Sequence, residues 1–160
     1  MTDDLAPKQL RTYFALIEAV SLLEHAVEQQ LREAGGISYI QFQILARLVN
    51  TTGQLTMTDL ADGIVYSRSG TTHQAALLEN MGLITRGPSL DDQRAVLVTI
   101  TDAGRAMVDK VLPGHIEVTR RLLFDPLSEQ DLHHLNDIMP RVRDHMRALP
   151  PRSAAPRNRR

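Results

Sequence analysis

The sequence predicts a mainly helical protein with one small β-hairpin, and three observations support this fold class. Apolar residues recur at helical spacing over most of the 160 residues. Capping residues and glycines mark where successive helices begin and end. Only residues 83–86 and 95–100 change to the composition of β-strands, and a polar turn separates them.

Two helices are predicted before residue 50. Apolar side chains at helical spacing from Lys8 to about Ala34 indicate a long first helix, which the glycine pair at 35–36 ends. Ser38 is a suitable N-cap for a second helix. The Asn-Thr-Thr-Gly sequence at 50–53 breaks that second helix.

Two shorter helices follow across a tight turn. Thr56 and Asp59 have the capping-box spacing that starts a helix, and Val65-Tyr66 makes the turn. Ser67 or Ser69 caps the next helix, which ends just before the hairpin. Its inner face is predicted to carry Thr71, Ala75 and Leu78. Two short helices followed at once by a hairpin are typical of a winged helix-turn-helix.

Two more helices are predicted after the hairpin. Thr101 caps a long helix that reaches about Leu123, and Pro113 is expected to kink it. Ser128 caps a last helix, which Pro140 is expected to bend.

Composition excludes several classes of protein. The chain has no cysteine, which rules out disulfides, thiolate zinc sites and cysteine-based redox sensing. No apolar run reaches the length of a transmembrane helix and the acidic N-terminus is no secretory signal, so we expect a cytoplasmic protein. No sequence motif of a catalytic site occurs, and the adjacent His133 and His134 point about 100° apart on a helix. We therefore expect no enzyme, no cofactor and no metal site.

The outer face of the second short helix carries side chains that suit contact with DNA. Arginine suits guanine, glutamine suits adenine, and hydroxyls suit either kind of base edge. These side chains lie in the N-terminal half of the helix, the end that enters the major groove and attracts anions. They are Arg68, Ser69, Thr72, His73 and Gln74. An ordinary solvated helix face is the alternative, and the adjoining hairpin favours DNA.

The tip of the hairpin carries Asp92 and Arg94, which lie two positions apart and so on one side of an extended backbone. An arginine at such a tip can enter a minor groove, and the aspartate can orient its guanidinium. Asp91 and Asp92 repel phosphate, so this hairpin is no generic basic patch. The alternative is an exposed ion pair that contributes less than about 1 kcal/mol.

The first and last helices carry apolar stripes that a small winged core cannot cover. A twofold dimer in which they interlock would cover both stripes, and a monomer that folds them back as a bundle is the alternative. The predicted division is an N-terminal dimerisation helix at 8–36, a winged helix-turn-helix at 37–100 and C-terminal dimerisation helices at 101–149. Residues 150–160 are predicted to be a disordered basic tail, since the chain holds five arginines and no acid from Arg147 onward.

These residues resemble the MarR family of bacterial transcription regulators. The resemblance lies in Leu60-Ala61 and residues 67–72 for the helix-turn-helix, 78–86 for the passage into the wing, Asp92-Gln93-Arg94-Ala95 for the wing tip, and 97–104 for the strand and helix start that follow. It is specific over about residues 38–105. Where relatives often carry a basic residue, this chain has Gln93 and His73, and a partly protonated His73 would make DNA binding sensitive to pH.

The resemblance implies a homodimer on a pseudo-palindromic duplex operator, usually acting as a repressor. Ser67 and Ser69 would lie near phosphates, Arg94 would enter the minor groove while Asp92 holds it, and Arg86 completes the expected DNA contacts. Family members often release DNA when a small aromatic or phenolic anion binds between the dimer helices and the DNA-binding lobe. Tyr13, Phe14, Tyr39 and Phe42 are the expected lining of such an effector pocket, with plain core packing as the alternative. A winged-helix module that contacts another protein instead of DNA is the alternative function.

Overall fold

The structure is a computed structural model that describes residues 5–64, 67–91 and 94–148. Its elements, in chain order, are α1 (Pro7–Gly35), α2 (Tyr39–Val49), β1 (Gln54–Thr56), α3 (Met57–Gly63), α4 (Arg68–Asn80), β2 (Ile84–Pro88), β3 (Val96–Ile100), α5 (Asp102–Thr119), the π-helical η1 (Arg120–Phe124) and α6 (Glu129–Arg147). The predicted fold class, mainly α with a small hairpin wing in a winged helix-turn-helix, is confirmed.

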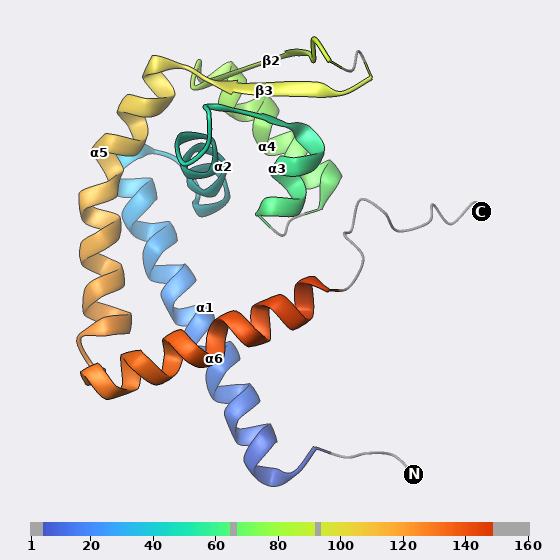
Figure 1. Ribbon diagram of the computed structural model, residues 1–160. Coiled ribbons are helices and arrows are strands. Elements are labelled where there is room, and N and C mark those ends of the chain that lie inside the picture. The colour runs from blue at the N-terminus through green and yellow to red at the C-terminus, as the bar shows by residue number, and fades with distance from the viewer. Residues whose placement is uncertain (1–4, 65–66, 92–93, 149–160) are drawn as a thin grey trace.

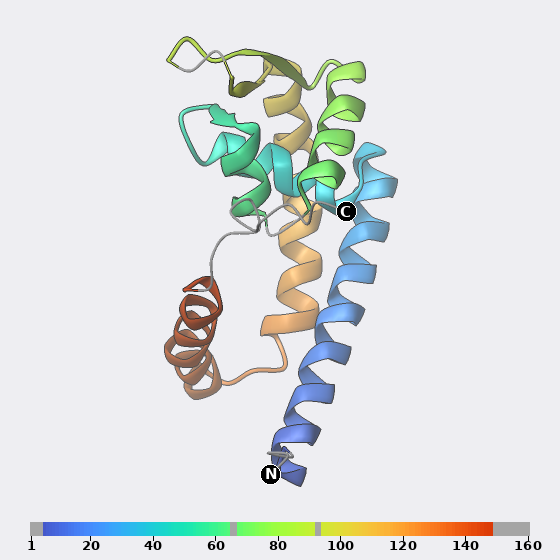
Figure 2. The same cartoon turned by 90° about the vertical axis from the view of Figure 1, so that its right-hand side faces the viewer.

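The molecule has two parts (Figure 1). Helices α2 to α4 and the three strands form a winged lobe, and α1 and α5 lead away from it side by side. Figure 2 shows α6 standing apart from α1 and α5 along most of its length. We call the exposed part of α1, residues 7–22, and helix α6 the helical arms.

Each helix from α2 to α6 begins at a serine or threonine. The side-chain oxygen of that residue accepts a hydrogen bond from the backbone N–H three residues further on, which satisfies a group that the helix itself leaves unpaired. These caps are Ser38, Thr56, Ser67, Thr101 and Ser128. Of the two serines considered for α4, Ser67 is the one that caps the helix.

The sheet has three antiparallel strands in the order β1-β3-β2. Strands β2 and β3 form the predicted hairpin, with Ile84 opposite Ile100. Strand β1 was not predicted, because a three-residue strand shows no periodicity of its own. It forms where Gln54 pairs with Thr99, on the outer edge of β3.

The core lies where the winged lobe meets α1 and α5. The predicted inner face of α4 is correct, since Thr71, Ala75 and Leu78 are fully buried. The other large side chains of the core that are fully buried are Leu31, Ile37, Ile44, Leu45, Leu48, Leu60, Ile84, Val98 and Val111. Helix α5 approaches the start of β2 so closely that a Cβ atom at Gly104 would meet the carbonyl oxygen of Leu83 at 2.2 Å.

The C-terminal helices follow the predicted order, except that the helix predicted to reach about Leu123 is α-helical only to Thr119. Pro113 lies inside α5, which stays α-helical to Thr119. The change in helix type comes later, at the π-helical η1. Pro140 likewise lies inside an α6 that is continuous from Glu129 to Arg147.

Candidate nucleic-acid interface and pocket

The N-terminal half of α4 presents a polar, exposed surface. Ser67, Arg68, Ser69, Thr72 and His73 are all exposed, as predicted for a surface that meets DNA. The first turn of α4 holds no acidic residue, so the positive end of the helix dipole is not neutralised there. Two of these hydroxyl groups also make hydrogen bonds within the helix. Ser67 accepts from the N–H of Gly70 at 3.1 Å, and Thr72 donates to the carbonyl of Arg68 at 2.9 Å.

Gln74 is half-buried and is held by α2. Its Oε1 accepts a hydrogen bond of 3.1 Å from Nε2 of Gln41, whose own Oε1 accepts from the N–H of Ser38 at 2.9 Å. A two-point contact with adenine requires the amide group of Gln74 to be held in one orientation. The hydrogen bond from Gln41 therefore controls which amide atom of Gln74 faces the base. Gln41 is not among the residues predicted from the sequence, although an amide within a mostly apolar helix indicates a buried polar contact.

Arg86 joins the root of the wing to the end of α4. Its Nη2 and Nε lie 2.8 and 3.0 Å from Oε2 of Glu79, and its backbone N–H donates to Oε1 at 2.9 Å. These hydrogen bonds lower the pKa of Glu79. The predicted DNA contact at Arg86 is therefore a guanidinium whose charge is already paired within the protein. Glu79 was missed because its partner lies across the Gly82 turn.

The wing projects from the lobe as a hairpin that runs above α3 and α4 (Figure 1). The hairpin stays paired as far as Ser89 and Ala95, where the N–H of Ser89 donates to the carbonyl of Ala95 at 3.0 Å. Arg94 follows the tip and is exposed. Asp92, its predicted partner, lies outside the described residues. Arg94 on the wing and the exposed end of α4 thus belong to the same lobe.

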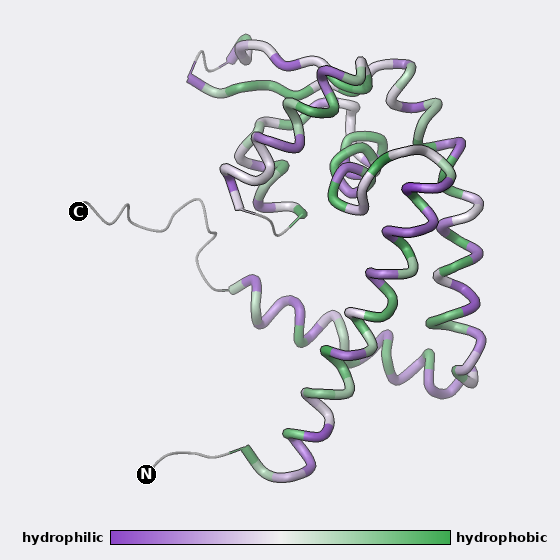
Figure 3. The backbone as a smooth tube through the Cα atoms, turned by 180° about the vertical axis from the view of Figure 1, so that it is seen from behind, coloured by the Kyte–Doolittle hydropathy of each residue, from purple (hydrophilic) through white to green (hydrophobic). Residues whose placement is uncertain are grey.

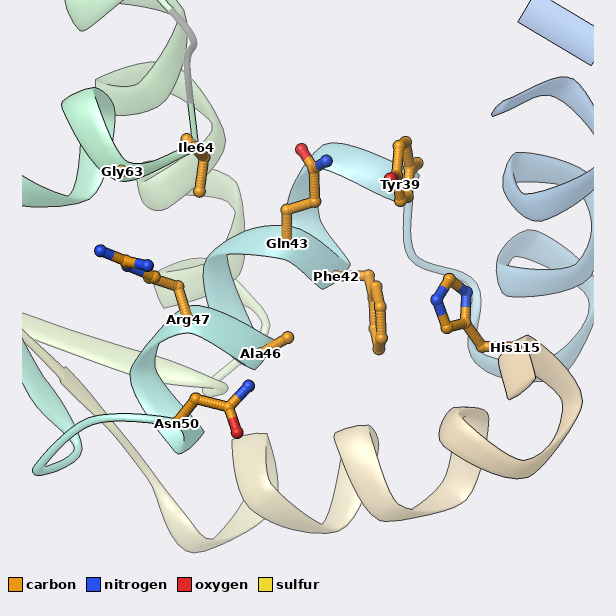
Figure 4. Close-up of a pocket in the computed structure, with 9 residues that line it drawn as sticks. All are labelled: Tyr39, Phe42, Gln43, Ala46, Arg47, Asn50, Gly63, Ile64 and His115. Carbon is orange, nitrogen blue, oxygen red and sulfur yellow. The ribbon is translucent and has the colours of Figure 1, made fainter. Parts of the chain in front are cut away.

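A pocket of about 390 Å³ opens between α2, α3 and α5 (Figure 4). Its lining residues are Tyr39, Phe42, Gln43, Ala46, Arg47, Asn50, Gly63, Ile64 and His115. Two of the four predicted aromatic residues, Tyr39 and Phe42, line it. The other two do not, because Tyr13 and Phe14 lie far along α1, 52 % and 63 % exposed, and pack edge-on against each other.

His115 completes the aromatic side of this pocket, and the sequence reasoning did not select it. Its ring lies against Phe42 with 4.6 Å between ring centroids. Burial disfavours the charged form of the ring and so lowers the pKa of His115. Its Nδ1 is buried without a hydrogen-bond partner among the described residues. The pocket lining therefore combines two aromatic side chains with an imidazole ring.

Helix-turn-helix, wing and capped recognition helix together define a winged-helix DNA-binding protein, and comparison with known proteins gives its family. A sequence profile of the MarR family matches residues 35–95. The chain is 28% identical over 132 residues to the HTH-type transcriptional regulator PecS of Dickeya dadantii, covering 81% of this chain and 79% of that protein. It is 31% identical over 111 residues to the uncharacterized HTH-type transcriptional regulator YfiV of Bacillus subtilis, covering 66% of this chain and 67% of that one. The chain belongs to the MarR family of transcriptional regulators.

The fold agrees with a solved member of the same family. Sco3205 from Streptomyces coelicolor, a MarR family transcriptional regulator crystallised in complex with DNA, superposes with a TM-score of 0.85 at 28% identity. The match covers 96% of this chain and 95% of that one. The relatives are transcriptional regulators, which agrees with the prediction that the chain is not an enzyme. None of the described helices combines the length and the apolar composition that a membrane span requires.

Proposed function

We propose that this regulator binds a pseudo-palindromic DNA duplex as a homodimer, acts there as a repressor, and releases the duplex when a small aromatic ligand enters the pocket. The observation that carries the proposal is the exposed N-terminal half of α4, which belongs to the same lobe as a projecting wing. The partners are duplex DNA, a second copy of the chain and the effector. The cytoplasm is where such a protein would act.

The homodimer is supported by the helical arms. Every residue from 7 to 22 is exposed, and no residue of α6 is buried. Both stretches are nevertheless rich in large apolar side chains, and Figure 3 shows these residues recurring along them. They include Leu10, Phe14, Ile17, Leu22, Leu132, Ile138, Val142 and Met146. Apolar surface of this extent is typical of a face that another protein surface covers.

The DNA contacts follow from what each exposed side chain can do. Arg68 and Ser69 lie at the positive end of α4, where phosphate or a base edge would be attracted. His73 can present both a donor and an acceptor to a base. Arg94, with Asp92 beside it in sequence, would enter the flanking minor groove. Arg86 would act by holding the wing against α4.

Selection from random duplexes tests the proposal, with the purified full-length chain as bait. We expect enrichment of an inverted repeat whose half-sites lie about 10 bp apart, since two recognition helices related by a twofold axis read one face of the duplex. Enrichment of single half-sites would contradict the dimer. No enrichment at all would favour the alternative, a winged-helix module that binds protein.

A further inference from the structure

A buried glutamine at the start of α2 has an amide group whose orientation the backbone fixes. Gln41 is only 6 % exposed, and its Oε1 accepts a hydrogen bond of 2.9 Å from the backbone N–H of Ser38. In return, the backbone N–H of Gln41 donates to Oγ of Ser38 at 3.2 Å. Because a backbone N–H can only donate, the amide of Gln41 must turn its oxygen toward Ser38. Its nitrogen is left to face α4.

The orientation of Gln41 in turn determines that of Gln74 on α4. Nε2 of Gln41 can only donate, and it lies 3.1 Å from Oε1 of Gln74. If the amide of Gln74 were reversed, two NH₂ groups would face each other beside a buried helix cap, and N–H groups would be left without an acceptor. The oxygen of Gln74 is therefore held by α2. Its Nε2 makes no hydrogen bond to the described residues and is not buried.

The free nitrogen of Gln74 lies on the part of α4 that is proposed to read DNA. Gln74 directly follows the exposed residues Thr72 and His73. Side chains of a helix lean toward its N-terminus, and the residue one turn before Gln74 is Gly70, which has no side chain to cover it. The half-buried Gln74 therefore has one amide atom held by α2 and another that is available to a base.

An amide that presents only N–H groups cannot make the two-point contact with adenine, which needs an acceptor beside a donor. Guanine suits it better, because the major-groove edge of guanine carries two neighbouring acceptors, O6 and N7. We propose that the hydrogen bonds from Ser38 through Gln41 to Gln74 set the base preference of α4, so that Gln74 selects guanine over adenine. This inference rests on the proposed function, and it replaces the adenine contact expected from the sequence. Gln41 is then a positioning residue that does not touch DNA.

Reversing the hydrogen bonds tests the proposal. In Gln41→Glu, one carboxylate oxygen can still accept from the N–H of Ser38, since glutamate also suits this position of a capping box. The other oxygen can only accept, so Gln74 must turn its nitrogen toward α2 and its oxygen toward the base. That oxygen suits the amino group of adenine. The variant should therefore prefer adenine where the wild type prefers guanine.

The measurement uses the full-length protein and an operator selected from random duplexes. Gln74→Ala identifies the base pair that Gln74 reads, because this variant loses the preference there. Fluorescence anisotropy then compares guanine with adenine at that position. We expect about a fivefold preference for guanine in the wild type and about fivefold for adenine in Gln41→Glu, the effect of one hydrogen bond. Inosine keeps O6 and lacks only the minor-groove amino group, so the wild type should bind it like guanine.

Three further variants separate the orientation of Gln74 from a general effect on α2. Gln41→Met removes the donor without adding charge and should bind guanine and adenine duplexes within about twofold of each other. Gln43→Glu is the matched control, because it adds the same charge to α2 at a residue that lines the pocket, and it should keep the guanine preference. The double variant Gln41→Glu with Gln74→Ala should show no preference.

A guanine preference that is unchanged in both Gln41→Glu and Gln41→Met would overturn the proposal. A wild-type preference for adenine at this position, or no base pair at which Gln74→Ala loses a preference, would also overturn it. In these cases the selected operator would leave the proposed DNA-binding function intact. Failure of the wild type to select any operator would contradict both proposals together.

Discussion

The winged lobe and the helical arms use apolar residues in opposite ways. In the lobe, Leu45, Leu48 and Leu60 are completely buried by their own chain. In the arms, Phe14, Leu22 and Met146 are each more than 60% exposed. The lobe is therefore packed by contacts within one chain, with α1 and α5 completing its core, whereas the arms reach a comparable burial only against another surface. Stability should reside in one part and assembly in the other.

The largest expected effect is the loss of a core side chain in the lobe. Leu60→Ala should lower the free energy of unfolding by about 2–5 kcal/mol, because it leaves a cavity among fully buried neighbours. Urea titration followed by circular dichroism measures this change. Leu90→Ala is the control, because Leu90 is 98% exposed on the wing and its truncation should change stability by less than about 0.5 kcal/mol.

A charge on the apolar side of α6 should break assembly and spare the lobe. Ile138→Asp should raise the dimer dissociation constant by a factor of 100 or more, roughly the cost of burying an unpaired carboxylate. Analytical ultracentrifugation over a concentration series measures it. Asn136→Asp adds the same charge about 200° around the helix and should leave the dimer intact. Equal dissociation in both variants would show that α6 does not form the interface.

The ion pair of Glu79 and Arg86 allows two roles of Arg86 to be distinguished, which are holding the wing in position and contacting DNA directly. If Arg86 acts by holding the wing, Glu79→Gln and Arg86→Gln should weaken operator binding by similar factors, about three- to tenfold, with equal salt dependence. If Arg86 touches phosphate, only Arg86→Gln should lower the slope of log K against log salt, by about one. Fluorescence anisotropy at four or more salt concentrations distinguishes the two outcomes.

The smallest expected effect is a pH dependence that arises from His115. Its pKa is lowered in the folded protein because burial disfavours the charged ring, so the unfolded chain binds the proton more readily. Stability should therefore fall as pH drops through 6.5, the ordinary value, toward the lower pKa of the folded state. His115→Phe keeps a ring against Phe42 and should remove this loss. Thermal unfolding of both proteins between pH 5 and 8 gives the comparison, and parallel curves would contradict it.

The sequence predicted those features whose partners lie within three or four residues. The caps at Ser38 and Thr101 are examples, because each accepts from an N–H three positions ahead. The inner face of α4 was predicted for the same reason, since helical periodicity is local. Element order then gave the winged helix-turn-helix without knowledge of any long-range contact.

Features that depend on distant partners were not predicted. Gln41 and Gln74 are 33 positions apart, and only the packing of α2 on α4 brings them together. Strand β1 exists because β3 pairs with it. The pocket shows the same limit. Aromatic composition selects Tyr39, which lines the pocket, but it also selects Tyr13, which lies exposed far along α1.

The central claim is that the exposed end of α4 and the wing form the DNA-binding surface. The most direct test compares wild-type protein with Arg68→Gln. Fluorescence anisotropy measures the binding of each to a selected operator at a series of salt concentrations. We predict saturation at two chains per duplex, with an affinity that falls steeply as salt rises because phosphate contacts release counterions. We also predict that Arg68→Gln loses about tenfold or more of the specific affinity at unchanged stability. Equal affinity of both proteins for operator and random duplex, at one salt-independent level, would contradict the proposed surface.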